Sequence, residues 1–142
     1  MGNVENEELL QPMTTLLLDP HPDLQHLIST YFHRRGQPVS LQPDLSKVLD
    51  TLGERGGTSY DCTVLPLGKD VAGSIDLIGT IRTRFPGLAI VVFTSALQFP
   101  EIKNACIAAG ADRYLTKTEG GVIGLYDACM SAFEGAHHAP VN

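Results

Sequence analysis

Short apolar runs alternate with amphipathic segments along most of the chain. Residues 14–19 (TTLLLD) form a continuous apolar run that ends in an acid, which is typical of a strand buried on both faces. Residues 88–94 (LAIVVFT) are the clearest strand, since they are rich in β-branched side chains. The sequence therefore predicts five strands, at residues 14–19, 38–42, 60–67, 88–94 and 111–116.

Each predicted strand is followed by a segment with apolar residues at helical spacing. After Pro22, for example, Leu24, Leu27 and Ile28 share one face, and Gly36 ends the segment. The five predicted helices run over residues 22–36, 44–53, 75–85, 100–110 and 122–133, and the second could instead end at the Gly56–Gly57 pair.

Strands that alternate with helices imply parallel pairing, because a parallel crossover needs a connection as long as a helix. We expect an α/β fold, a flavodoxin-like doubly wound sheet of order 2-1-3-4-5. Pro38 places the second strand near an edge, since proline donates no ladder hydrogen bond. The predicted domain covers residues 13–133, with a flexible N-terminal extension at 1–12 and a flexible tail or linker start at 134–142.

Composition narrows the class of protein. A chain of 142 residues and 15.3 kDa makes one domain, and its formal net charge of −6 gives no general attraction for nucleic-acid phosphates. No signal-peptide pattern or apolar run of about 20 residues is present, so we expect a cytoplasmic protein with no membrane association. The three cysteines, Cys62, Cys106 and Cys129, are widely spaced on apolar faces and predict buried thiols.

In a doubly wound sheet the working edge is formed by the carboxyl ends of the strands. The loops to inspect begin at Asp19, Pro66, Thr94 and Lys117. They contain no catalytic triad, phosphate-binding loop or cluster of metal ligands, and His21 is a lone histidine. The sequence therefore predicts a protein that is not an enzyme.

Four segments, in this order, resemble the receiver domain of two-component response regulators: LLLDPHPDL, YDCTVLPLGKDVAGSIDLIGTIRTRFP, IVVFTSA and AAGADRYLTK. The likeness covers residues 13–133 and is closest to receivers attached to helix-turn-helix transcription factors. It implies an acidic pair after the first strand, a phosphoacceptor aspartate after the third, a hydroxyl after the fourth, a lysine after the fifth, and an aromatic switch residue before that lysine.

Carried over position by position, the resemblance leaves the acidic centre incomplete. The first acid is Asp19, but the second acid falls on Pro20 and the phosphoacceptor on Pro66. The other positions are the hydroxyl Thr94, the lysine Lys117 and the switch aromatic Tyr114.

Proline supplies neither a nucleophilic carboxylate nor a backbone N–H. Mg²⁺ usually takes one or two carboxylates, so we expect Mg²⁺ binding to be weak or absent and no cofactor to be needed. We expect no phosphorylation by the usual route. Lys117 either pairs with Asp19 or extends into water. Thr94 and Tyr114 are then relics, locked in one state or biased by a partner.

Two alternatives stay open. Asp70, in the loop after Pro66, is either a substitute phosphoacceptor or a solvated loop acid, whereas Asp61 lies at the wrong end of its strand. The emptied pocket beside Lys117 could instead accept a small neutral or weakly anionic molecule.

The leading interpretation is a degenerate receiver that acts by protein–protein interaction without phosphorylation. Its partner is a signalling or DNA-binding regulator, or a second copy bound through the fourth helix, fifth strand and fifth helix. Four apolar residues there do not all fit one buried stripe, so either they form an exposed patch or they all pack in the core: Ile107, Leu125, Met130 and Phe133.

Overall fold

The structure is a computed structural model, and it describes residues 12–54, 60–95 and 99–137. The predicted N-terminal extension, apart from Pro12, lies outside these described residues, as do residues 138–142 of the predicted tail.

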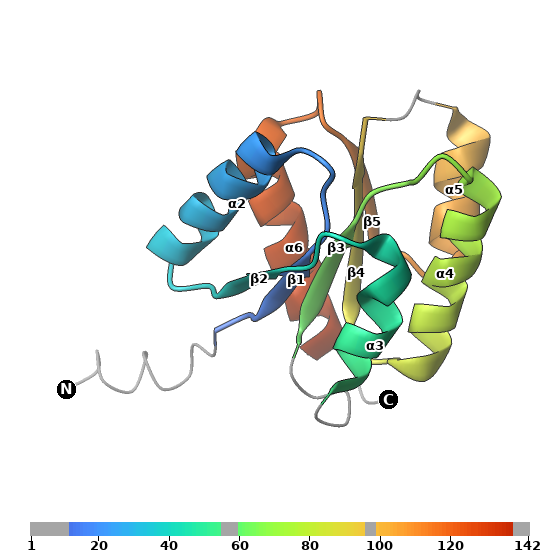
Figure 1. Ribbon diagram of the computed structural model, residues 1–142, viewed down its shortest axis with the longest axis horizontal. Helices are drawn as coiled ribbons and strands as arrows, with labels where there is room; N and C mark the ends of the chain where they lie inside the picture. Colours follow the sequence, from blue (N-terminus) through green and yellow to red (C-terminus); the bar gives the residue numbers. More distant parts are fainter. Residues whose placement is uncertain (1–11, 55–59, 96–98, 138–142) are drawn as a thin grey trace.

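The described residues form a five-stranded parallel sheet with the order β2-β1-β3-β4-β5, which confirms the predicted topology (Figure 1). The strand β2 is an edge strand, as Pro38 indicates. The strands are β1 (Thr15–Leu17), β2 (Val39–Leu41), β3 (Cys62–Leu65), β4 (Ala89–Thr94) and β5 (Arg113–Thr116).

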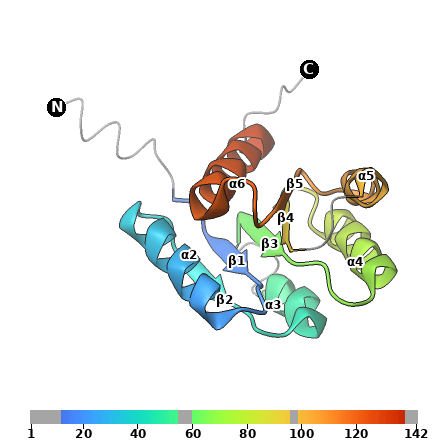
Figure 2. The same cartoon turned by 90° about the horizontal axis from the view of Figure 1, so that it is seen from above.

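Helices cover both faces of this sheet. Seen from above, α2 and α6 lie on one face, and α3, α4 and α5 lie on the other (Figure 2). The helices are α2 (Pro22–Arg34), the 3-10 turn η1 (Leu45–Lys47), α3 (Val48–Gly53), α4 (Val71–Arg84), α5 (Pro100–Ala109) and α6 (Gly121–His137).

The sheet separates two hydrophobic cores, which explains why its strands read as continuous apolar runs. In β1, Leu17 packs toward α2 and α6, while Leu16 packs toward the opposite face. In β4, Val91 and Phe93 contact the first core, and their neighbours contact the second. Since successive strand residues point to opposite faces, both faces need apolar side chains.

Element boundaries differ from the prediction at several ends. Each strand is shorter than its predicted run, because residues at one or both ends of the run do not join the ladder. Asp44 begins a 3-10 turn, because its side chain accepts a hydrogen bond from the Ser46 backbone N–H at 2.9 Å. The last helix continues to His137, beyond the expected boundary at Phe133. No helix within the described residues is long and apolar enough to cross a bilayer.

Candidate functional site

Four of the singled-out residues gather at the carboxyl edge of the sheet. Asp19 follows β1, Pro66 directly follows β3, Thr94 ends β4, and Lys117 directly follows β5. This edge is at the top in Figure 1. Parallel pairing brings these strand ends together, and the backbone N–H of Lys117 donates to the Thr94 carbonyl at 2.9 Å.

The buried centre of this edge is an ion pair. Lys117 Nζ lies 2.9 Å from Asp19 Oδ2, with the lysine side chain 15% exposed and the aspartate side chain fully buried. The predicted pair is therefore confirmed, and the alternative in which Lys117 extends into water is wrong. At this distance the ammonium and the carboxylate are in direct contact, so each charge is balanced inside the protein.

The second oxygen of Asp19 is also engaged. Its Oδ1 accepts a hydrogen bond from the His21 backbone N–H at 2.9 Å, which fixes the turn between β1 and α2. His21 thus contributes its backbone to this edge, in keeping with its interpretation as a loop residue.

The donors at this edge do not fit Mg²⁺. Asp19 is the carboxylate that follows β1, and a lysine ammonium already neutralises it. Pro20 is exposed and Pro66 is half-buried, and neither side chain can ligate a cation. No group of three or more His, Cys, Asp or Glu side chains in the described parts of the chain could hold a metal ion.

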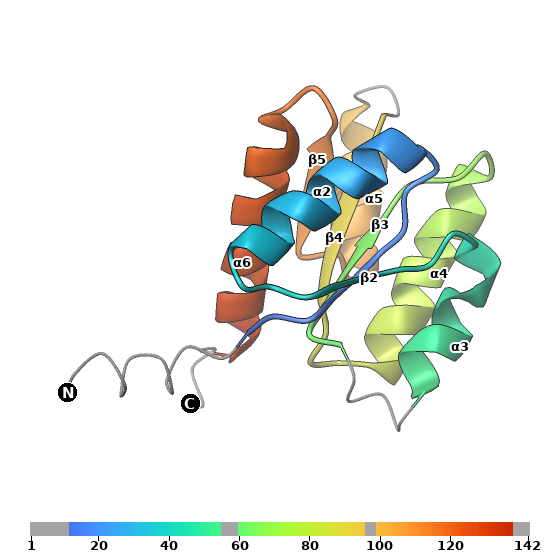
Figure 3. The ribbon, with the colours of Figure 1, turned by 60° about the vertical axis from the view of Figure 1, so that its left-hand side comes forward.

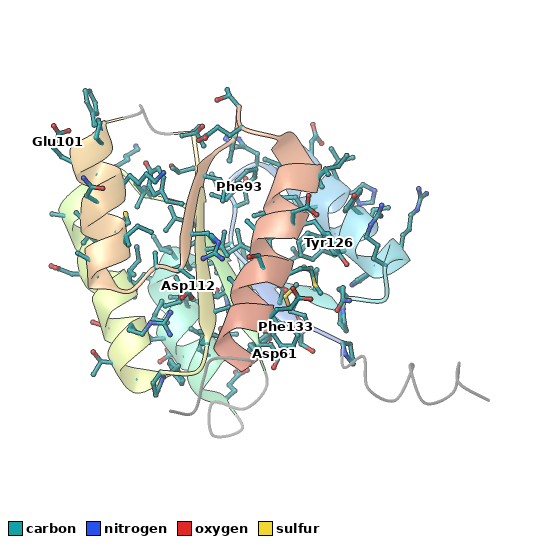
Figure 4. All side chains as sticks on the ribbon, turned by 180° about the vertical axis from the view of Figure 1, so that it is seen from behind. Asp61, Phe93, Glu101, Asp112, Tyr126 and Phe133 are labelled. Atoms are coloured by element: carbon teal, nitrogen blue, oxygen red, sulfur yellow. The ribbon has the colours of Figure 1, made fainter. Side chains whose placement is uncertain are left out.

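Asp70 has a structural role as the N-terminal cap of a helix. Its side chain caps α4, with Oδ1 accepting from the Gly73 backbone N–H at 3.0 Å, and its carbonyl accepts from the Ser74 hydroxyl at 3.0 Å. Asp61 is at the opposite edge, where its Oδ2 accepts from the Thr14 backbone N–H (Figure 4). An acid that caps a helix is held by backbone donors, so Asp70 is preorganised as a cap.

Tyr114 points its polar end into the protein. The residue is half-buried and packs on the core formed with α3, α4 and α5, and its hydroxyl is buried with no hydrogen-bond partner among the described residues. Burial raises the pKa of the Tyr114 phenol, with smaller contributions from Cys106 and Glu119. The neutral phenol is therefore the stable form of this side chain.

Sequence reasoning did not identify Glu119. Its Oε1 accepts from the Thr116 backbone N–H at 3.0 Å and from the Thr116 hydroxyl at 2.7 Å, so it closes the turn after β5. These two hydrogen bonds lower the pKa of the Glu119 carboxyl. The signal was the spacing Thr-x-x-Glu, which commonly marks reciprocal side chain–backbone bonding.

The expected apolar patch is corrected in part. Leu125 and Phe133 are buried and Met130 is half-buried, because the inward face of α6 packs on the sheet (Figure 4). Ile107 on α5 is exposed, as expected, and Phe99, just before that helix, is exposed as well. The apolar surface on this side is therefore centred on α5.

All three cysteines are free and buried, as predicted. Burial raises the pKa of the Cys106 thiol. The pKa of Cys62 is raised strongly by its neighbour Cys129 and by burial. All three thiols are therefore small side chains of the core.

Comparison with known proteins points to one class. No protein-family model matches the chain. The probable transcriptional regulatory protein TcrX of Mycobacterium tuberculosis is 27% identical over 107 residues, which are 75% of this chain and 44% of that protein. The chain thus spans less than half of the length of this curated relative.

Solved structures define the fold. A CheY-like response-regulator receiver domain protein from Methanospirillum hungatei JF-1 superimposes with a TM-score of 0.77 at 14% identity, over 92% of this chain and all of that one. An atypical orphan response regulator, described as having a phosphorylation-independent regulatory mechanism, gives a TM-score of 0.73 at 16% identity, over 86% and 96% of the two chains. The chain has the fold of response-regulator receiver domains.

Proposed function

We propose that this chain is a degenerate receiver of a transcription-regulatory system, which signals in the cytoplasm by protein–protein interaction and without phosphorylation or catalysis. One observation carries the proposal. The acid expected to help hold a phosphoryl group, Asp19, is bound to Lys117 at 2.9 Å, and the positions beside it are Pro20 and Pro66. This edge offers no nucleophile at the phosphoacceptor position and no second acid for a cation.

The proposal also concerns the switch residue Tyr114, which should stay in one orientation. The resemblance implies that the switch aromatic turns inward when a receiver is phosphorylated, and the Tyr114 hydroxyl is already buried. With no phosphate to shift the equilibrium, the orientation depends on packing alone. We therefore expect Tyr114 to stay inward whether or not a phosphoryl donor is present.

The proposed working surface is formed by α5, β5 and α6. Phe99 and Ile107 expose apolar side chains there, at 51% and 42%. Phe99 also lines a cavity of about 330 Å³, together with Lys103, Tyr114 and Glu119 among others. An apolar surface with a charged rim suits a protein partner. The partner is a second copy or a DNA-binding regulator, as the relationship to a transcriptional regulatory protein suggests.

Sedimentation tests this surface with a matched pair of variants. The dissociation constant of a dimer of the full chain should be at least tenfold higher for Ile107→Asp than for the parent chain. Ile123→Asp is the control, because Ile123 is also exposed but lies on α6 beside α2. Acetyl phosphate with Mg²⁺ should leave the association unchanged. A chain whose self-association rises on acetyl phosphate treatment would contradict the proposal.

Phosphorylation on Asp70 is disfavoured by its capping bonds. To serve as a phosphoacceptor, this carboxylate would have to leave the α4 N-terminus, at a cost of about 1 kcal/mol for the lost cap. Binding of a small molecule beside Lys117 remains a prediction, which a ligand-dependent rise in melting temperature would test.

A further inference from the structure

A groove on the other side of the molecule is not used by the proposed function. It is a cavity of about 410 Å³ between α2 and α6. Two of its walls expose large apolar side chains, Leu27 on α2 at 57% and Ile123 on α6 at 58%. Exposed apolar side chains that face one another across a hollow are an unfavourable surface unless something covers them.

The groove is also cationic. Arg34 and Arg35 line it, and none of its lining residues is a carboxylate. The guanidinium of Arg35 lies 3.6 Å from the centre of the Tyr31 ring and 5.6 Å from that of Tyr126, so its position is fixed by stacking. In a chain with a formal net charge of −6, such a site suits an occupant that carries both carboxylates and apolar side chains.

The chain itself carries a matching sequence. Residues 4–10 read VENEELL, with three glutamates, one valine and two leucines. These residues lie outside the described part of the structure, but Met13 shows where they join it. Its side chain is buried in the core under α2 and α6, and its N–H donates to Gln37 Oε1, just beyond the end of α2 (Figures 2 and 3).

The lengths allow this sequence to reach the groove. Glu8 is five residues from Met13, which an extended chain spans in up to about 17 Å, and Val4 is nine residues away, or up to about 30 Å. Along α2, Arg34 is seven positions after Leu27, a separation of about 10 Å. A chain leading from Met13 can therefore pass the arginines first and the apolar pair second.

We propose that residues 4–10 of this chain dock in the groove between α2 and α6, with Glu7 and Glu8 paired to Arg34 and Arg35 and with Val4 toward Leu27 and Ile123. Covalent attachment favours this occupant, since a tethered segment is present at a high effective concentration. A second copy bound by two-fold symmetry at this groove would bring arginines close to arginines. The segment thus covers the α2–α6 face and leaves α5 free for the surface proposed above.

Methyl NMR of the full chain tests the docking, with Ile123 as the reporter and Ile107 as the matched control, because both are exposed. Glu7→Lys with Glu8→Lys should move the Ile123 signal and leave that of Ile107 in place. Arg34→Glu should produce the same displacement, and combining all three substitutions should restore at least half of it. Glu101→Lys, an exposed charge reversal on α5, should leave the Ile123 signal in place.

A peptide of residues 1–11 supplies the second measurement. Added to the full chain with Glu7→Lys and Glu8→Lys, it should return the Ile123 signal toward its parent position, and a peptide with the same two substitutions should not. If the Ile123 signal is the same in all variants, the docking is wrong. A signal that changes only with protein concentration would assign the groove to a second copy and would also overturn the proposal.

Discussion

Two ion pairs, at opposite edges of the same sheet, are built in different ways. At the carboxyl edge, Lys117 binds Asp19 at 2.9 Å, with the aspartate side chain fully buried. At the other edge, Arg82 on α4 binds Asp112 at 2.8 Å, with both side chains partly exposed. The same guanidinium donates to the carbonyls of Gly110, Pro86 and Leu88.

The two ion pairs differ in what their members bind besides one another. Arg82 joins α4 to the loops before β4 and β5, and Asp112 also accepts from the Ile90 backbone N–H at 2.8 Å. All three guanidinium nitrogens of Arg82 donate to oxygen acceptors, as expected for a side chain whose task is to hold loops together. Asp19 and Lys117 neutralise one another in a buried place, so the stability of this pair depends on the presence of both charges.

The largest effect is expected from breaking the buried pair on one side. Lys117→Met leaves the carboxylate of Asp19 buried without a counter-charge, and we expect the free energy of unfolding to fall by about 3 kcal/mol. Replacing both members, with Asp19→Asn and Lys117→Met, should restore at least half of that loss. Urea unfolding of the two singles and the double variant measures this. A double variant as unstable as the sum of the singles would show that the two side chains act independently.

For the Arg82–Asp112 pair, in contrast, removing the second member should not restore the stability that is lost with the first. Arg82→Met should lower the free energy of unfolding by about 2 kcal/mol, since several carbonyls lose their donor and water replaces it only in part. Adding Asp112→Asn should not restore stability, because the carbonyl acceptors remain unpaired. Arg84→Met is the control, with an expected change within about 0.5 kcal/mol. If Asp112→Asn restored the free energy of unfolding lost in Arg82→Met, the two ion pairs would be built alike, against this prediction.

Two buried hydroxyls allow a comparison of how much a hydrogen-bonded and an unbonded polar group contribute to stability. Thr63→Val removes a hydroxyl that donates to the Leu16 carbonyl at 3.1 Å, and should cost about 1 kcal/mol. Tyr114→Phe removes a buried hydroxyl that has no hydrogen-bond partner among the described residues, and should be neutral or stabilising by up to about 1 kcal/mol. Thermal unfolding compares the two. A marked loss of stability in Tyr114→Phe would mean that its hydroxyl has a bonded partner in solution.

The smallest effect concerns pH. The pKa of Glu119 lies below its ordinary value of 4.5, because Thr116 donates two hydrogen bonds to the charged form. The stabilisation is therefore present above about pH 4.5 and is lost as the pH falls through the folded pKa. Between about pH 5 and about pH 3, the melting temperature of the Glu119→Gln variant should fall less steeply than that of the parent chain. An unchanged slope would contradict this assignment.

The sequence predicted the topology because the sheet is buried on both faces, so each strand is a continuous apolar run. It also predicted the Asp19–Lys117 pair, since both residues follow strands that end at one edge. It did not predict that Leu125 and Phe133 are buried, because the width of the inward face of α6 depends on how closely that helix packs on the sheet. The Arg82 network was missed as well, because its acceptors are mostly backbone carbonyls, which leave no pattern in side-chain chemistry.

We propose that this chain, with Pro66 at the phosphoacceptor position, does not accept a phosphoryl group. Intact-protein mass spectrometry of the full chain, after incubation with acetyl phosphate and Mg²⁺, tests it most directly. We predict a single species with the mass of the unmodified chain. A species heavier by one phosphoryl group, stable in the parent chain and absent in an Asp70→Asn or Asp19→Asn variant, would contradict the account.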